Sequence, residues 1–427
     1  MIYKLNKRPK YQYFILYGLP LLIFQLFQYR EIPAIILKMS GFIAPVLLFI
    51  ITFKFLCNRK YKHNEIPNII KWILIDVLIV YFMAYFFWEQ PFLNSYRSSI
   101  WCLNLIYFFL LLKYKFTEKE LIYFIIIFSI INILLWIYAL TQAPQVIFGR
   151  IGDSDDIAHY SNNRGLFRIS ILGRNLVTLL FFFFFVKMFK GRKIIHFFIS
   201  FILLIYICSD LTRFNIASVL LTLICYVVFI AKKEVKSILF TISVLFLSII
   251  LIYSIWGEQI EILLNLTANQ FKGKLSSNND GMWRAREYIY FITEFNTNPF
   301  TYILGNGFAN SSSLQILLDR IKVLKMYFLS DVSYMQIFIS MGLIGLFLYL
   351  KLIIKAISLK TDASLIYVKL YLLYALVSNL TIDTILDTLT LSICLYLIYR
   401  SNINYKQNNH HNKKTLPNEI HNCDTCF

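Results

Sequence analysis

The stretch ELIYFIIIFSIINILLWIYALT, residues 120–141, decides the class of fold because it has no charged side chain after Glu120. A helix that crosses the hydrocarbon of a bilayer needs about 20 largely apolar residues, since every backbone N–H and C=O must be satisfied within the segment once water is absent. Residues 120–141 have that length and that composition. They predict a transmembrane helix.

Apolar segments of the same kind recur along almost the whole chain. Of the 427 residues, 58% are hydrophobic and only 15% are charged, whereas about a quarter of a soluble domain is charged. This composition excludes a soluble globular domain and predicts an all-α polytopic membrane protein, one integral membrane domain over 1–427. We expect about 12 transmembrane helices, at 11–28, 34–56, 69–87, 98–113, 120–141, 171–189, 194–208, 214–231, 237–256, 332–354, 363–380 and 384–399.

Lysine-rich connections set the expected orientation, because short loops rich in Lys and Arg stay cytoplasmic. Such clusters alternate along the chain and fall on one side, at 59–62, 113–119, 187–193, 232–236 and 351–360. The basic N-terminus and the tail 400–427 fall on the same side, so both termini are expected in the cytoplasm. The formal charge of +19 then reflects lysines beside anionic lipid headgroups, and no nucleic-acid partner is needed to explain it.

Two connections are longer than the others, and both are expected outside: a first outer loop, 142–170, and a large outer loop, 257–331. The large loop carries its own helical pattern over 282–295, a break at Asn298-Pro299 and a tight turn at Gly305 and Gly307. Its second half, 314–329, mixes apolar residues with cations, as expected of a helix lying along the membrane interface.

Arginine and lysine are sorted to opposite sides of this predicted topology. Ten of the fourteen arginines map outside: Arg30, Arg97, Arg150, Arg164, Arg168, Arg174, Arg213, Arg284, Arg286 and Arg320. Arginine binds phosphate or carboxylate oxygens with a planar fork of donors, whereas lysine acts as a point charge. The sorting predicts a site for a phosphorylated or otherwise anionic ligand. Contacts to lipid phosphate, or ion pairs with acidic loop residues, are the alternative reading of each arginine.

Four sequence elements around the large outer loop share one resemblance. They are Leu211-Thr-Arg213-Phe-Asn, Arg284-Ala-Arg-Glu-Tyr288, Asn298-Pro299 leading into Leu304-Gly305-Asn-Gly307, and Asp331-Val-Ser-Tyr334-Met-Gln336 followed by Gly342-Leu-Ile-Gly345. Their order and spacing, over about residues 170–350, resemble the O-antigen polymerase (Wzy-type) and O-antigen ligase superfamily. Ligases of this family usually have His where this chain has Asp331, which favours a polymerase.

The resemblance implies that undecaprenyl-diphosphate-linked oligosaccharide units are polymerised at the outer face of the bacterial cytoplasmic (inner) membrane. It implies a metal-independent glycosyltransferase without a cofactor, whose fixed cations stabilise the leaving diphosphate. The catalytic residues expected are Arg213, Arg284 and Asp331, where Asp331 is either a general base or a helix cap. The substrate-binding residues expected are Arg164, Arg168, Arg174, Arg286 and Tyr334.

The expected partners are the lipid-linked oligosaccharide, membrane lipids, a chain-length regulator and a flippase. Three other functions stay open: a flippase for the same lipid-linked sugar, a ligase of the same superfamily, and a scaffold for envelope enzymes. A transporter usually has ionisable residues deep in the bundle or broken helices. Asp76 is expected near the cytoplasmic end of its span. The acidic cluster 153–156 with His159 lacks a regular metal-ligand spacing.

Overall fold

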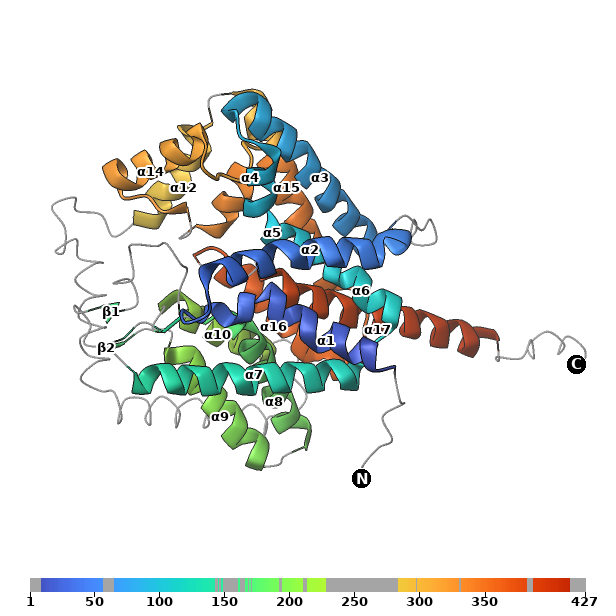
Figure 1. Ribbon diagram of the computed structural model, residues 1–427. Coiled ribbons are helices and arrows are strands. Elements are labelled where there is room, and N and C mark those ends of the chain that lie inside the picture. The colour runs from blue at the N-terminus through green and yellow to red at the C-terminus, as the bar shows by residue number, and fades with distance from the viewer. Residues whose placement is uncertain are drawn as a thin grey trace, which may run out of the picture.

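The computed structural model describes residues 9–56, 65–142, 145, 147–148, 160–161, 166–167, 169, 171–191, 194–209, 213–227, 283–296, 298–329, 332–381 and 387–414. These residues are almost entirely helical (Figure 1). The exception is one short antiparallel pair, in which β1 (Tyr160–Ser161) faces β2 (Leu166–Phe167) with Tyr160 opposite Phe167. The described part of the chain is therefore helical, as the sequence predicts.

The helices follow the predicted apolar windows closely. They are α1 (Lys10–Ile23), α2 (Ala34–Leu56), α3 (Glu65–Trp88), α4 (Phe92–Ser98), α5 (Ile100–Leu103), α6 (Tyr107–Tyr114), α7 (Glu118–Thr141), α8 (Arg174–Gly191), α9 (Ile194–Ser209), α10 (Arg213–Cys225), α12 (Trp283–Thr293), α13 (Pro299–Leu304), α14 (Ser313–Lys325), α15 (Ser333–Ser358), α16 (Ile366–Ser378) and α17 (Thr388–Lys414). Eleven of the twelve windows overlap one of these helices, and the window 237–256 lies outside the described residues.

A helix that coincides with a predicted apolar window is not always long enough to cross a membrane. Four described helices, α2, α3, α7 and α15, are long and apolar enough to cross a membrane. A fifth crossing results if α4 and the segment Ile100–Tyr114, bent by 65° to each other, count as one span. Several others, such as α10 and α16 with 13 residues each, are shorter than the bilayer requires. The fold is that of an α-helical membrane protein, but twelve crossings are not confirmed.

The bundle buries its aromatic residues and also exposes many. Tyr107, Phe108 and Phe109 are completely buried, whereas Trp72 and Phe86, on the outward side of α3, are 60% and 73% exposed. An apolar exterior of this kind suits contact with lipid, since lipid tails remove the cost of exposing apolar surface to water. Close neighbours in the bundle include α8 with α9, α7 with α8, α15 with α3 and α16 with α10.

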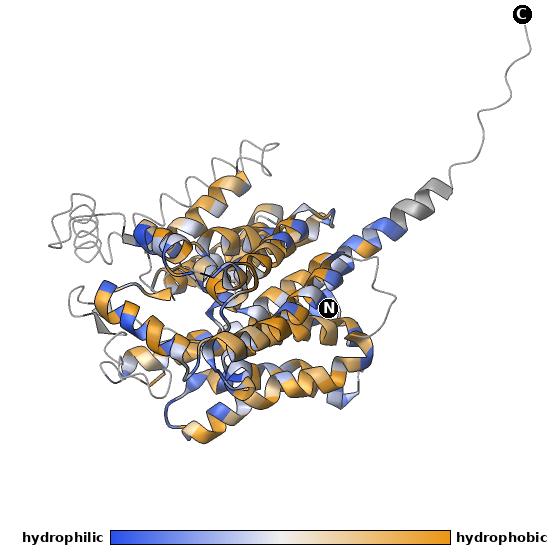
Figure 2. Ribbon diagram, turned by 90° about the horizontal axis from the view of Figure 1, so that it is seen from above, coloured by the Kyte–Doolittle hydropathy of each residue, from blue (hydrophilic) through white to orange (hydrophobic). Residues whose placement is uncertain are grey.

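The two ends of the bundle differ in the arginine and lysine residues that lie there. We call one end the arginine end: α3 and α16 finish there, α8, α10 and α15 begin there, and Arg174 and Arg284 lie there. We call the other the lysine end. There Nζ of Lys113 donates a hydrogen bond to Ile51 O near the end of α2, and the carbonyl of Lys360 accepts one from Nδ2 of Asn402 in α17. The second half of α17 projects beyond the bundle on that side, and it is markedly hydrophilic (Figures 1 and 2).

Helix α15 is broken at Gly342, about a third of the way along it, and a loop that precedes the helix in the chain fills the break. Gly342 has φ +66°, so the carbonyls before it have no helical partner. The N–H of Asn306 donates to Ile339 O (2.8 Å) and the N–H of Gly307 donates to Ser340 O (3.1 Å). We call residues 298–307 the wedge. It enters the bundle between α15 and α3, and it satisfies the carbonyls that the break leaves open.

The wedge fits only because of its glycines. A Cβ on Gly305 would lie 2.3 Å from Ser340 O, and one on Gly307 would lie 2.4 Å from the Cβ of Ala84. Both glycines have positive φ, which side-chain-bearing residues adopt at a cost. The two glycines predicted to permit a tight turn thus allow the backbone to approach α15 and α3 closely.

The first span ends earlier than predicted. Helix α1 finishes at Ile23, whereas the apolar window runs to residue 28. From Gln25 to Gln28 four consecutive residues have φ between 50° and 59°, a left-handed turn. Such a turn costs about 1–2 kcal/mol per residue for L-amino acids, so hydropathy alone gives no sign of it.

Candidate functional site

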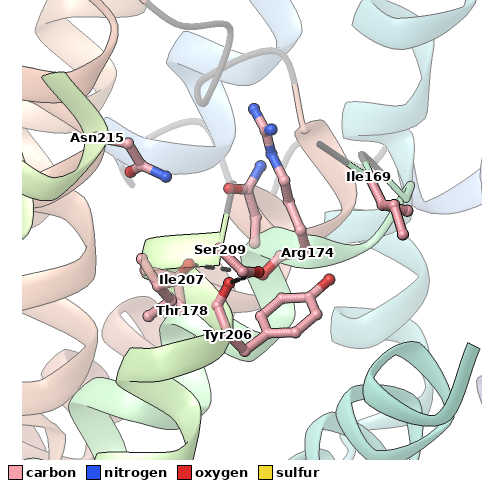
Figure 3. A pocket seen from close by; sticks show the side chains of 8 residues that line it. Ile169, Arg174, Thr178, Tyr206, Ile207, Ser209 and Asn215 are labelled. Carbon is pink, nitrogen blue, oxygen red and sulfur yellow. Dashed lines mark hydrogen bonds between the residues drawn. The ribbon is translucent and has the colours of Figure 1, made fainter. Parts of the chain in front are cut away.

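A pocket opens at the arginine end where three helices converge (Figure 3). The space among its lining residues, open solvent included, is about 330 Å³, and the enclosed part is only about the size of one water molecule. Its wall is formed by the first residues of α8, the last residues of α9 and the third residue of α10. One residue that precedes α8 completes it. Its lining residues are Ile169, Arg174, Asn175, Thr178, Tyr206, Ile207, Ser209 and Asn215.

Two helices begin at this pocket, and each begins with an arginine. Arg174 is the first residue of α8, and Arg213 is the first residue of α10, two positions before the pocket residue Asn215. Neither helix has an acidic residue in its first turn. A helix N-terminus carries partial positive charge and attracts anions, and a cation there adds to the same field. The arrangement favours an anion.

Arg174 is half-buried, and its guanidinium extends away from the ring of Tyr206 in Figure 3. The structure describes Arg213 by its backbone, and its side chain lies outside what is described. Thr178 lies one turn along α8 and turns its hydroxyl to the carbonyl of Arg174 at 3.5 Å. The first turn of α8 therefore presents one guanidinium with small polar groups beside it.

Buried asparagines hold the pocket wall in place. The hydroxyl of Tyr206 donates to Oδ1 of Asn132 in α7, and Nδ2 of Asn132 donates to Leu172 O (2.7 Å), two residues before α8. The ring of Tyr206 also meets that of Trp136 edge-on at 5.4 Å between centroids. Both hydrogen-bonding ends of the Asn132 amide are thus used to fix α9 and the entry to α8 against α7.

The end of α16 connects this pocket to the large loop. Tyr374 of α16 donates its hydroxyl to Oδ1 of Asn215. Just past the end of α16, Thr381 O accepts from Nη1 of Arg284 (3.2 Å) and Leu380 O accepts from the hydroxyl of Tyr288 (2.8 Å). The α10 start and α12 therefore contact α16 within two turns of each other.

Arg284 lies where a cation is stabilised. Helix C-termini carry partial negative charge, and the guanidinium of Arg284 donates to a carbonyl there while its side chain stays exposed. Burial raises the pKa of Tyr288 to about 12, and the charge of Arg284 opposes part of that rise. Tyr288 is therefore neutral at pH 7 and acts as a hydrogen-bond donor.

Helix α12 is fixed from its other side by Glu287. This glutamate is fully buried, and its Oε1 accepts from the backbone N–H of Phe328 (3.0 Å). Arg286, the residue before it, is exposed. Arg284 and Arg286 are two positions apart, so they point to different sides of the helix.

Tyr334 lies at the first turn of α15 and is largely buried. Its hydroxyl donates to Leu376 O in α16 (2.6 Å). The structure thus brings Arg174, the start of α10, Arg284 and Tyr334 around the end of α16. A direct contact of Tyr334 with substrate stays a prediction.

Three predicted site residues, Arg164, Arg168 and Asp331, lie outside the described residues, as does the cluster 153–156 with His159. Among the residues that are described, no three His, Cys, Asp or Glu side chains gather as metal ligands would. The role of Asp331 as a general base, and the roles of Arg164 and Arg168 in substrate binding, therefore stay predictions.

Asp76 is not where the sequence analysis expected it. It lies midway along α3, between Glu65 and Trp88, and is 3% exposed. The span begins earlier than predicted, which moves Asp76 from the helix end to its centre. Within the described part of the chain, its Oδ2 has no hydrogen-bond partner, and a Cβ on Gly345 of α15 would lie 3.0 Å from that oxygen.

Comparison of the sequence with protein-family models, with curated proteins and with solved structures gives no match. The function is therefore inferred from the geometry at the arginine end and from the four sequence elements around the large outer loop.

Proposed function

We propose that the arginine end binds the diphosphate of a polyprenyl-linked saccharide, and that the protein polymerises undecaprenyl-diphosphate-linked oligosaccharide units into a surface polysaccharide. One observation carries the proposal: α8 and α10 meet at one pocket, and each begins with an arginine, Arg174 and Arg213. Two positive helix ends with two guanidinium groups favour a ligand with two adjacent phosphates.

In this reaction a hydroxyl of one lipid-linked unit attacks the anomeric carbon of a second lipid-linked chain. The new glycosidic C–O bond forms as the C–O bond to the diphosphate breaks, and undecaprenyl diphosphate leaves with the electron pair. The hydroxyl proton passes to a base, for which Asp331 is our choice. Guanidinium groups aimed at the diphosphate stabilise the charge that develops there, without reorganising during the step.

Arg284 and Arg286 supply further positive charge from α12. Arg284 donates to Thr381 O just past the end of α16, and Tyr374 of the same helix donates to Asn215 in the pocket. Arg164 and Arg168 are assigned to substrate binding on sequence grounds. The proposed topology has twelve spans, both termini in the cytoplasm of a bacterium and the arginine end outside its inner membrane. The opposite placement of Lys113 and Lys360 supports this orientation.

The decisive experiment replaces the arginines one at a time in cells whose surface polysaccharide is made with this protein. Arg213→Ala and Arg284→Ala, correctly inserted, should lower chain extension by about a hundredfold or more, the usual effect of removing one preorganised donor. Single repeat units should still appear on the cell surface. The matched control is Arg97→Ala, an exposed arginine of α4 that is not part of the site. Normal long-chain polymer in both variants would contradict the proposal.

A second candidate function is a transporter of the same lipid-linked units, and Asp76 is the observation that favours it. A buried carboxyl at the centre of a span, one turn from the break in α15, is typical of coupled carriers. The two functions differ in where lipid-linked units accumulate when the gene is deleted. Accumulation on the cytoplasmic face indicates a lost transporter, and accumulation on the outer face indicates a lost polymerase.

A further inference from the structure

Helix α14 carries apolar side chains on two opposite faces. Leu314 and Ile321, seven residues apart, are buried against the rest of the molecule, whereas Ile316 and Val323, also seven apart, are 56% and 75% exposed. Seven residues make about two helical turns, and a shift of two residues turns a side chain by about 200°. One apolar face of α14 packs inward, and the other faces outward.

The outward apolar surface continues to the last turn of the helix and to the residue that follows it. Leu324 is 81% exposed and Met326 is 63% exposed, next to Val323. Exposed apolar side chains are common one at a time, but a contiguous group with polar neighbours marks a surface that binds something apolar. The outward face of α14 is such a group.

Both ends of α14 bond to other segments of the chain, and the bond at its start indicates the depth of α14 relative to the bilayer. The hydroxyl of Ser313 donates to the carbonyl of Trp88 at 3.0 Å, and Trp88 is the last residue of the membrane-length helix α3. At the other end, Nζ of Lys325 lies 3.1 Å from Oε2 of Glu294 and 3.9 Å from the centre of the Tyr290 ring. Because α3 is long enough to span the bilayer, α14 starts where that helix reaches the bilayer surface. Tryptophan is typical of that level.

The charges of α14 identify the surface that covers it. Arg320 precedes Val323 by three positions and Leu324 by four, so it lies between them on the helix, and it is exposed. Lys322 is exposed as well, with its Nζ 5.5 Å from the centre of the Phe328 ring. Apolar side chains with cations beside them are the composition of helices that lie in the headgroup region of anionic membranes.

We propose that the outward face of α14, formed by Ile316, Arg320, Val323 and Leu324, rests in an anionic phospholipid surface and anchors the large loop to the membrane. The apolar side chains enter the boundary between headgroups and acyl chains, and Arg320 and Lys322 contact phosphate oxygens. This anchor does not depend on the reaction proposed above.

A photo-reactive benzophenone amino acid at position 324 tests the proposal. The full chain is purified, placed in vesicles of zwitterionic lipid with or without anionic phospholipid, illuminated and examined for lipid adducts by mass spectrometry. Position 323 serves as a second site. Position 315 serves as the control, because Gln315 lies on the polar side of the same helix, where its Nε2 donates to Asp319 (2.9 Å).

Lipid adducts at 324 and 323 should exceed those at 315 about tenfold, because only the outward face reaches the acyl boundary. Removing anionic lipid should lower the yield about fivefold, and the double variant Arg320→Gln with Lys322→Gln should remove that dependence. Equal yields at all three positions, or none at 324 and 323, would overturn the proposal. So would adducts to a protein in native membranes in place of lipid.

Discussion

At the scale of single residues, a hydrogen bond between Tyr374 and Asn215 links the first turn of α10 to α16. The hydroxyl of Tyr374 is buried and donates to Oδ1 of Asn215 in the pocket. Removing that hydroxyl in Tyr374→Phe leaves a buried amide oxygen without its donor, which costs about 1–3 kcal/mol. We expect a lower thermal unfolding midpoint in detergent, measured by the fluorescence of the purified protein.

Tyr367 of the same helix offers a matched control. It is also buried, but in the described part of the chain its hydroxyl has no hydrogen-bond partner. Tyr367→Phe removes the same atom without breaking a bond, so its midpoint should stay the same or rise. Equal losses in the two variants would mean that the bond to Asn215 contributes nothing.

Gln90 holds the large loop to the end of α3. Its buried side chain donates to Phe308 O (2.6 Å) and to Ser95 Oγ (2.8 Å), and it accepts from the N–H of Asn310 (2.9 Å). Gln90→Leu leaves the N–H of Asn310 without its acceptor, at about 1–3 kcal/mol, whereas Phe308 O keeps the hydroxyl of Ser98 as a donor (2.9 Å). We expect protease cleavage near residue 310 to become faster. Gln12→Leu, at a half-buried glutamine of α1 whose Nε2 donates to the hydroxyl of its neighbour Tyr11 (3.2 Å), should leave the cleavage pattern as it is.

At the scale of elements, the break in α15 and the wedge depend on each other. A Cβ on Gly342 would lie 2.2 Å from Ile303 O, and its φ of +66° is unfavourable for alanine. Gly342→Ala should destabilise the protein by about 1–3 kcal/mol, the range of strained or overpacked core substitutions. Thermal unfolding measures the loss. Gly18→Ala is the control, because its Cβ would meet only the side chain of Phe14.

Elements were predictable to different degrees for a physical reason. Continuous apolar windows locate α2 and α7 to within two residues, because the bilayer dictates length and composition together. The break at Gly342 could not be predicted from hydropathy, since the residues on both sides are equally apolar. It exists because the wedge, over thirty residues earlier in the chain, supplies the missing donors.

At the scale of the whole molecule, arginines gather at one end and lysines at the other, with Lys325 at the first end and Arg400 at the second as exceptions. This sorting was predictable from the sequence. The arginines of the pocket and of α12 lie at one end, and Lys113 and Lys360 lie at the other. The pocket itself was not predictable. Asn132 and Asn215 are single polar residues in apolar windows, and only the packing of α7, α9, α10 and α16 shows what they hold. Their position within spans was the one available signal, because buried amides need partners.

The central claim is that the arginine end faces outward, and cysteine labelling of intact spheroplasts tests it directly. The starting protein is a variant in which the seven native cysteines, among them Cys423 and Cys426 of the tail, are replaced by serine. Thr293→Cys, at an exposed position of α12, and Lys406→Cys, on the projecting part of α17, then place one thiol at each end. A membrane-impermeant maleimide should label position 293 at once and position 406 only after permeabilisation, with the cysteine-free starting protein as the blank. Labelling of 406 from outside, or of 293 only after permeabilisation, would contradict the account.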